Sequence, residues 1–297
     1  MTTGSGVGEG AAGPGPAGVP ECPKHPGAPA MVRCQRCRRP VCPACQVPAA
    51  VGVQCPECVR AGNRSRPVAR SVFGAPLTGG MPVVTVGAIA LCVLAYLGQA
   101  LTRGALTNDW IMAPAVVWIQ PWRLVTAGFL HGGVAHLLLN MYALWVVGSF
   151  VEQLIGRWRF AALYLASVVG GHAAVLIYTR LFDCGVDGIL TGTEGASGAV
   201  FGLFAAAFVL SRRLGGEIRG IAGVIGLNLV LGVVIGGISW QAHIGGLLTG
   251  AAMAAVYAYA PRGRRRLYAW FAIGGAVIVM AGIVIATYGP WLPLVCR

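Results

Sequence analysis

The chain has 297 residues, of which 56% are hydrophobic and only 10% are charged, and its mean hydropathy is +0.72. Soluble domains carry charge on roughly a quarter of their residues, so this composition excludes an ordinary soluble domain and indicates a membrane protein. The net charge of +13 comes partly from basic residues between apolar stretches, which favours membrane orientation over nucleic-acid binding. We expect a lipid bilayer as partner and no nucleic acid.

Residues 1–20 form a tail of Gly, Pro and Ala. Such a segment buries too little apolar surface to offset its chain entropy, so the sequence predicts disorder there. The tail also lacks the basic start and apolar core of a signal peptide. We therefore expect the N-terminus in the cytoplasm.

Residues 21–59 hold seven of the ten cysteines and predict a zinc-binding domain. Eight ligands fall in four close pairs, which are Cys22-x2-His25, Cys34-x2-Cys37, Cys42-x2-Cys45 and Cys55-x2-Cys58. Eight ligands suit two zinc ions, and four ligands per ion leave no open position, which is typical of structural sites. Disulfides are disfavoured because the cytoplasm is reducing.

This cysteine module resembles the B-box zinc finger. The resemblance implies an interleaved pairing, in which one ion takes Cys22, His25, Cys42 and Cys45 and the other takes Cys34, Cys37, Cys55 and Cys58. The last pair departs from the family, because a B-box usually ends in two histidines. Sequential pairing remains the alternative.

The remaining chain alternates between basic connections and apolar segments. Residues 60–82 are polar and broken by proline and glycine, which predicts a linker. Seven apolar segments follow, most near the ~20 residues that cross a hydrocarbon core, at 83–101, 124–148, 159–179, 197–211, 219–237, 240–260 and 267–288. The sequence thus predicts an all-α polytopic membrane protein with a small N-terminal zinc-binding domain.

The positions of the arginines predict the orientation in the membrane. A cytoplasmic N-terminus places nine of them in inner connections, where the positive-inside rule favours them, namely Arg157, Arg159, Arg212, Arg213, Arg219, Arg262, Arg264, Arg265 and Arg266. The C-terminus then lies outside the cell membrane. Cys184 and Cys296 also fall outside, where a disulfide is permitted, but nothing in the sequence determines their separation, so whether they pair stays open.

Polar residues inside membrane spans are costly and are functional candidates by default. His136 and Asn140 lie four apart on one helix face, Ser197 opens the short fourth segment, and His243 lies near the outer end of the sixth. Counting back to the inner charges places all three groups in the outer leaflet. We therefore expect one site rather than scattered polar residues.

These residue types suit nucleophilic catalysis. A serine needs a neighbouring base, so we predict Ser197 as nucleophile and His243 as base. Two small-xxx-small faces, Gly198/Gly202 and Gly246/Gly250, would pack the two helices closely. Donors from His136, Asn140 and the backbone N–H of Ser197 could hold an oxyanion.

A lone Gly-x-Ser-Gly is weak evidence, but this combination resembles the rhomboid family of intramembrane serine proteases. The four family motifs WR, HxxxN, GxSG and AHxxGxxxG occur in order, as Trp122-Arg123, His136 with Asn140, Gly195 to Gly198, and Ala242, His243, Gly246 and Gly250. The resemblance implies a Ser197–His243 dyad without an acidic member, an oxyanion hole of His136, Asn140 and Ser197, and no cofactor for catalysis. It also implies a six-helix core over 83–260, while 261–297 adds a seventh helix and an outer tail.

Other polar residues receive structural interpretations. The resemblance places His131 near the site, and Phe201 replaces a tyrosine that stacks on the catalytic histidine in some relatives. Glu152 resembles an inner-end packing motif, and His172 has the context of a helix-packing histidine. Three acidic residues before Ser197 are expected to be solvated, namely Asp183, Asp187 and Glu194. Tryptophans in the first outer loop are expected to anchor it at the membrane interface.

The sequence thus predicts an endopeptidase that cleaves transmembrane protein substrates near the outer face. Two alternatives stay open. One is a non-catalytic rhomboid-like protein that binds membrane clients, which the intact Ser197 and His243 disfavour. The other is a docking adaptor in which the zinc domain binds a cytoplasmic protein partner, for which seven spans are excessive.

Overall fold

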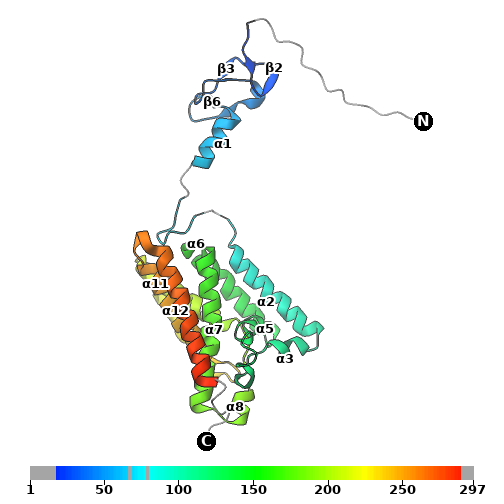
Figure 1. Ribbon diagram of the computed structural model, residues 1–297, viewed down its shortest axis with the longest axis vertical. Helices are drawn as coiled ribbons and strands as arrows, with labels where there is room; N and C mark the ends of the chain where they lie inside the picture. The colour runs from blue at the N-terminus through cyan, green and yellow to red at the C-terminus, as the bar shows by residue number, and fades with distance from the viewer. Residues whose placement is uncertain (1–17, 66–68, 78–79, 289–297) are drawn as a thin grey trace, which may run out of the picture. The chain divides into compact units, whose positions relative to one another are not determined.

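A computed structural model describes residues 18–65, 69–77 and 80–288. The tail predicted to be disordered falls mostly outside these residues, as does Cys296. The chain divides into two compact units, Met1–Val68 and Ala69–Arg297, and both appear in Figure 1.

The first unit consists of short hairpins and one helix. Its elements are β1 (Glu21–Cys22), β2 (His25–Pro29), β3 (Val32–Arg33), β4 (Pro40–Val41), η1 (Pro43–Cys45), β5 (Val47–Pro48), β6 (Val53–Gln54) and α1 (Pro56–Ser65). The strands pair antiparallel as β1–β2, β3–β4 and β5–β6. Its buried core is made mainly of cysteines with Ala30 and Val41, which is too little apolar surface to hold so small a unit without metal.

The segment expected as a linker, 60–82, holds more structure than its composition indicates. Its first residues complete α1, and residues 69–77 form a turn closed by a bridge between Arg70 and Pro76. This turn belongs to the second unit, where Phe73 is 1% exposed. The Ser71 hydroxyl donates to the carbonyl oxygen of Leu154 at 2.6 Å.

The second unit is helical throughout. Its helices are α2 (Val83–Leu101), α3 (Ala105–Trp110), η2 (Pro114–Val116), α4 (Arg123–Thr126), η3 (Ala127–Phe129), α5 (Val134–Ala143), η4 (Leu144–Gly148), α6 (Ser149–Ile155), α7 (Arg157–Phe182), α8 (Val186–Leu190), α9 (Ser197–Arg213), α10 (Arg219–Val234), α11 (Trp240–Tyr259), η5 (Arg262–Arg264) and α12 (Arg265–Tyr288). The second span, predicted over 124–148, instead runs from Val134 to Ile155 with a π-helical turn at η4, and residues 123–129 form the short helices α4 and η3 before it.

The protein is an integral membrane protein with several spans. Four helical stretches among the described residues are long and apolar enough to cross a bilayer, namely Val83–Leu101, Val134–Ile155, Arg157–Phe182 and Arg262–Tyr288. Helices α9, α10 and α11 coincide with the other predicted apolar segments. The six-plus-one count of spans stays a prediction.

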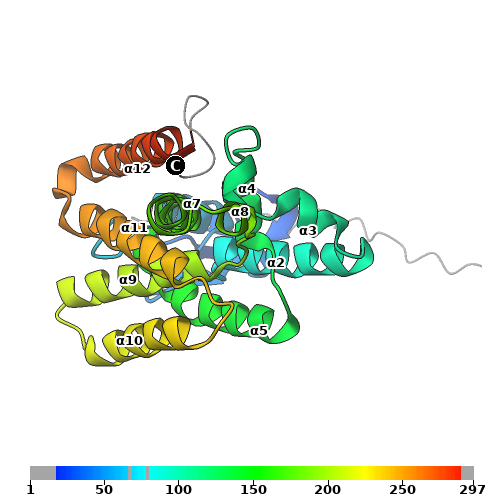
Figure 2. The same ribbon diagram turned by 90° about the horizontal axis from the view of Figure 1, so that it is seen from below.

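Helices α7, α9 and α11 pack against one another at the centre of this unit, as Figure 2 shows. Glycines make the contact close: a Cβ on Gly246 would collide with the backbone of Gly198, and one on Gly250 with the backbone of Gly202. A Cβ on Gly171 of α7 would lie 2.9 Å from the Ala242 carbonyl oxygen. The small-xxx-small spacing therefore corresponds to an actual backbone contact between α9 and α11.

Candidate active site and metal sites

Ser197 is the first residue of α9, at the end of a loop held in one conformation. Gly195 has φ +127°, a region that residues with a side chain rarely adopt. Its N–H donates to the Ala127 carbonyl oxygen at 2.9 Å, which ties the loop to the end of α4. Ser197 is half-buried, so its hydroxyl lies within the protein without being sealed from solvent.

His243 lies in the first turn of α11, and its ring stacks on Phe201 of α9. The two ring centroids are 4.1 Å apart and the planes differ by 12°. Phe201 follows Ser197 by one helical turn, so both residues occupy the same face of α9. The stacking therefore places His243 beside the face of α9 that carries Ser197. Its Nδ1 is buried and has no hydrogen-bond partner among the described residues.

His136 of α5 approaches the same loop from the other side. A Cβ on Gly195 would lie 2.8 Å from Cε1 of His136, 3.0 Å from its Nε2 and 3.7 Å from Oγ of Ser197. The His136 ring and the Ser197 hydroxyl therefore both border Gly195. Asn140 is buried, and its side-chain amide donates to the His136 carbonyl oxygen at 2.9 Å, which leaves its second N–H without a partner among the described residues.

His131 packs edge-on against His136, with ring centroids 5.0 Å apart. Its Nδ1 lies 3.3 Å from the Phe129 carbonyl oxygen. Because a carbonyl only accepts, Nδ1 carries the proton and Nε2 remains an acceptor without a partner in the described chain. His131 thus forms a second layer behind His136.

A polar network that the sequence interpretation missed supports this layer. The side-chain oxygen of Gln99 accepts from the His131 backbone N–H at 3.0 Å, and its nitrogen donates to Thr107 Oγ1 at 3.0 Å and to Glu194 at 3.5 Å. The expectation that Glu194 is solvated is wrong, because its side chain is half-buried and burial raises its pKa. Gln99 therefore links α2 to the loop before α5, through His131, and to the loop before α9, through Glu194.

Arg123 and Trp122 have different positions. Arg123 is buried and donates to the carbonyl oxygens of Asn108 at 2.6 Å and Ile111 at 2.8 Å. Trp122 is 53% exposed. The arginine therefore holds the loop between α2 and α4, while the tryptophan is available for the membrane interface or for a partner.

Two other polar residues in the spans have structural partners. His172 is buried, and its Nδ1 lies 2.8 Å from the Leu124 carbonyl oxygen, which agrees with a helix-packing role. The Glu152 carboxylate accepts from the N–H groups of Val84 and Thr85 and from the Thr85 hydroxyl, at 2.8 to 3.1 Å. Glu152 therefore caps the N-terminus of α2.

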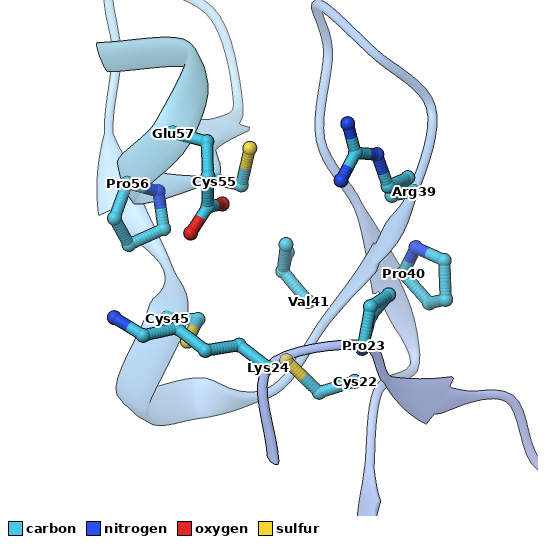
Figure 3. A pocket seen from close by; sticks show the side chains of 10 residues that line it. All are labelled: Cys22, Pro23, Lys24, Arg39, Pro40, Val41, Cys45, Cys55, Pro56 and Glu57. Carbon is cyan, nitrogen blue, oxygen red and sulfur yellow. The ribbon is translucent and has the colours of Figure 1, made fainter. Parts of the chain in front are cut away.

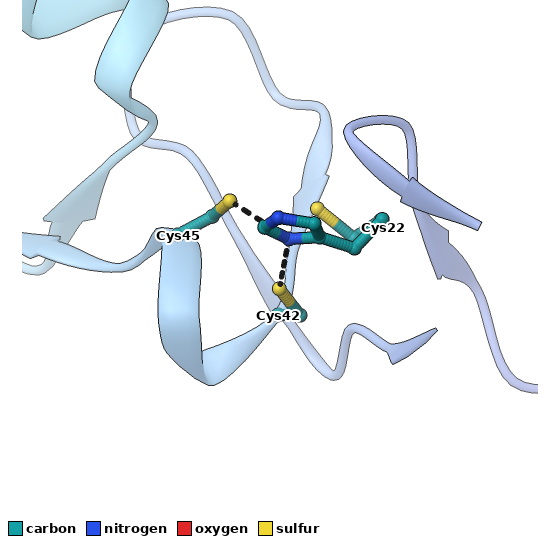
Figure 4. A group of neighbouring side chains, drawn as sticks. Cys22, Cys42 and Cys45 are labelled. Carbon is teal, nitrogen blue, oxygen red and sulfur yellow. Dashed lines mark hydrogen bonds between the residues drawn. The ribbon is translucent and has the colours of Figure 1, made fainter. Parts of the chain in front are cut away.

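The eight metal ligands form two tetrads in the first unit. Cys22, His25, Cys42 and Cys45 make one and Cys34, Cys37, Cys55 and Cys58 the other, and within each the ligand atoms lie within 4.8 Å of one another. The pairing is interleaved, as the B-box resemblance implies, and sequential pairing is ruled out. Figure 4 shows Cys22, Cys42 and Cys45 converging on the first site.

The chemistry of the first tetrad fits a divalent cation. The backbone N–H of Cys42 contributes most to lowering the pKa of the Cys22 thiol to about 6, which favours the thiolate. Burial and the neighbouring sulfurs of Cys22 and Cys42 instead raise the pKa of Cys45 to about 11. Thiolates so close together repel one another, so a metal ion is needed before all of them ionise.

A cavity of about 240 Å³ opens beside the tetrads, as Figure 3 shows. Cys22 and Cys45 of one tetrad and Cys55 of the other line it. Lys24 and Arg39 place two positive charges on its wall and Glu57 places one negative charge there.

Two domains of known families match the chain. Residues 119–260 match the Rhomboid domain, and residues 18–49 match the B-box zinc finger. Both predicted resemblances are thereby confirmed. The B-box match ends before Cys55 and Cys58, the pair that departs from the family pattern.

Rhomboid proteins are among the relatives. The chain is 30% identical over 195 residues to rhomboid protease GluP of Bacillus subtilis, covering 61% of this chain and 36% of the relative. It is 35% identical over 139 residues to RHOMBOID-like protein 4 of Arabidopsis thaliana (44% and 32%). It is 27% identical over 190 residues to rhomboid protease AarA of Providencia stuartii (57% and 63%). The chain thus spans between about a third and under two thirds of these relatives.

Proposed function

We propose, from the rhomboid domain that this chain carries beside a B-box zinc finger, that it is an intramembrane serine endopeptidase. Its substrates are transmembrane proteins cleaved near the outer membrane face. The observation that carries the proposal is the convergence of three polar residues from three helices. Ser197 and His136 both border Gly195, and His243 stacks one turn further along the face of α9 that bears Ser197.

In the proposed reaction, the Ser197 hydroxyl attacks the carbonyl carbon of the scissile peptide bond, and His243 takes the hydroxyl proton. The C–N bond then breaks, His243 delivers the proton to the leaving amine, and an ester on Ser197 remains. Water activated by His243 hydrolyses this ester. No described carboxylate hydrogen-bonds to Nδ1 of His243, which supports a dyad rather than a triad.

The developing oxyanion needs donors that are in place before reaction. Ser197 begins α9, so its backbone N–H has no partner within the helix and lies at the positive end of the helix dipole. The His136 ring borders the same position, and Asn140 supplies the second N–H of its amide. One such donor is typically worth about 10²–10³ in rate.

The zinc-binding unit has a separate proposed role. Its donors fit two structural zinc ions, one in each tetrad, with 21–59 as the metal-binding domain. We propose that it docks a cytoplasmic protein partner. The N-terminus then lies on the cytoplasmic side of the cell membrane and the C-terminus on the outer side. Fusing to each end a reporter that works only in the cytoplasm tests this orientation. Activity of the reporter at the C-terminus would overturn it.

The decisive experiment follows cleavage of a tagged single-span substrate in a membrane expression host. Ser197→Ala and His243→Ala should each abolish the product at matched expression. Ser211→Ala is the matched control, because it removes a buried hydroxyl from the other end of the same helix and should leave cleavage intact.

A serine-directed phosphonate separates the remaining outcomes. Labelling of Ser197 without cleavage would indicate an active site tested on the wrong substrate. Absence of both labelling and cleavage in the folded protein would refute the protease and favour a rhomboid-like protein that binds membrane clients without cutting them.

A further inference from the structure

The second unit, Ala69–Arg297, has a pocket of its own where α11 ends and α12 begins. It has a volume of about 280 Å³, and its walls combine the side chains of Val72, Phe73 and Tyr259 with three arginines, namely Arg213, Arg262 and Arg265. Three chain segments that are far apart in sequence therefore meet around one cavity with cationic groups on its wall.

None of the three arginines forms an ion pair with a described carboxylate. Nε of Arg265 is buried without a hydrogen-bond partner, and the end of its side chain lies against Gly74, where a Cβ would be 3.0 Å from Nη1. The Arg213 guanidinium lies over the Tyr259 ring, 5.5 Å from its centroid. Arg159 repels Arg265 and adds positive charge nearby.

Arg265 is half-buried with its Nε cut off from solvent, whereas Arg213 and Arg262 are exposed. Like charges around one cavity repel one another, and an anion with several acceptor oxygens relieves this repulsion. Phosphate suits this need, because each guanidinium offers a planar fork of donors to its oxygens. The chemistry of the pocket therefore selects a phosphate group rather than an apolar ligand.

The position of the pocket indicates the source of that phosphate. The candidate span of α12 begins at Arg262, so the pocket lies at the membrane surface where lipid headgroups are found. Beyond it, α12 presents the exposed side chains of Trp270 and Phe271, which suit acyl chains. We propose that this pocket binds the phosphate of an anionic phospholipid headgroup. The inference does not depend on protease activity.

Native mass spectrometry of the full chain in detergent tests the proposal, with phosphatidylglycerol and phosphatidylcholine supplied in equal amounts. The pocket variant replaces Arg213, Arg262 and Arg265 with Gln. The matched control replaces Arg212, Arg264 and Arg266 with Gln, which removes the same charge from the same segments without touching the pocket. We expect the wild-type chain and the control to retain phosphatidylglycerol preferentially, and the pocket variant to bind it at least about tenfold more weakly.

Two further comparisons complete the test. One distinguishes binding in the pocket from binding to a general basic surface, and the other distinguishes a lipid headgroup from free phosphate. Equal loss in both triple variants would mean that the general basic surface holds the lipid and would overturn the pocket. Thermal stabilisation of the wild-type chain by inorganic phosphate, without retained lipid, would overturn the lipid source. If the triple variant does not fold, Arg213→Gln at the exposed end of α9 provides the test, and unchanged lipid retention by this folded variant would refute the proposal.

Discussion

Replacing Gly246 by Ala tests whether glycine packing holds the site together. The added Cβ would collide with the backbone of Gly198, which cannot rotate away as a side chain would. Helices α9 and α11 must therefore separate, and the movement carries His243 away from Ser197. Overpacking of this kind costs about 1–3 kcal/mol of stability, and a displacement of about 1 Å at reacting groups costs about 10²-fold in rate.

The assay combines thermal unfolding in detergent with cleavage of the single-span substrate. Gly274→Ala is the matched control, because it lies in α12 and a Cβ there meets no atom within 4 Å. We expect the control to behave like the wild type and Gly246→Ala to lose both stability and most of its activity. Wild-type stability and activity in Gly246→Ala would show that α9 and α11 do not depend on this contact, and the reasoning would fail.

Three further predictions concern the remaining elements. Glu152→Ala should lower stability by about 2–3 kcal/mol in thermal unfolding, because it leaves three donors at the start of α2 unpaired. Asp109→Ala, which removes an exposed carboxylate, should change stability little. A chelator should unfold an isolated fragment of residues 18–65, and a circular dichroism spectrum unchanged by chelation would contradict structural zinc. Deleting Met1–Val68 should leave substrate cleavage intact, whereas extending the deletion through residue 77 should destabilise the core because it removes the buried Phe73.

Spacing along a single helix predicted contacts well in this protein. Residues four apart share a helix face whatever the tertiary structure, so Gly198/Gly202 and Gly246/Gly250 could be expected to meet if their helices were neighbours. A different regularity, the two-residue gap repeated within each pair, made the four Cys and His pairs visible. Their interleaved arrangement was not readable from spacing, because every pair has the same gap, and it came instead from the B-box resemblance.

Contacts between distant segments could not be read in the same way. Gln99 and Glu194 are 95 residues apart, and neither belongs to a repeating pattern. A lone amide in an apolar span was the available signal for Gln99, since such a group needs a buried partner. Phe73 was missed because the prolines and arginines around it indicate a linker. Its turn packs against the end of α6 and the start of α7, which follow much later in the chain.

The polar residues that stabilise the fold differ from the proposed catalytic residues in whether their side chains have hydrogen-bond partners. The Glu152 carboxylate and Nδ1 of His172 are buried and have partners in the protein, which assigns both residues to holding the fold. Ser167 also lacks a partner, but it is fully buried and out of reach. Ser197 and His136 are half-buried, and neither the serine hydroxyl nor the imidazole is hydrogen-bonded to the described chain. Unused hydrogen-bonding capacity that a substrate can reach is what acyl transfer requires, which is why these two residues, with His243 beside them, carry the proposed chemistry.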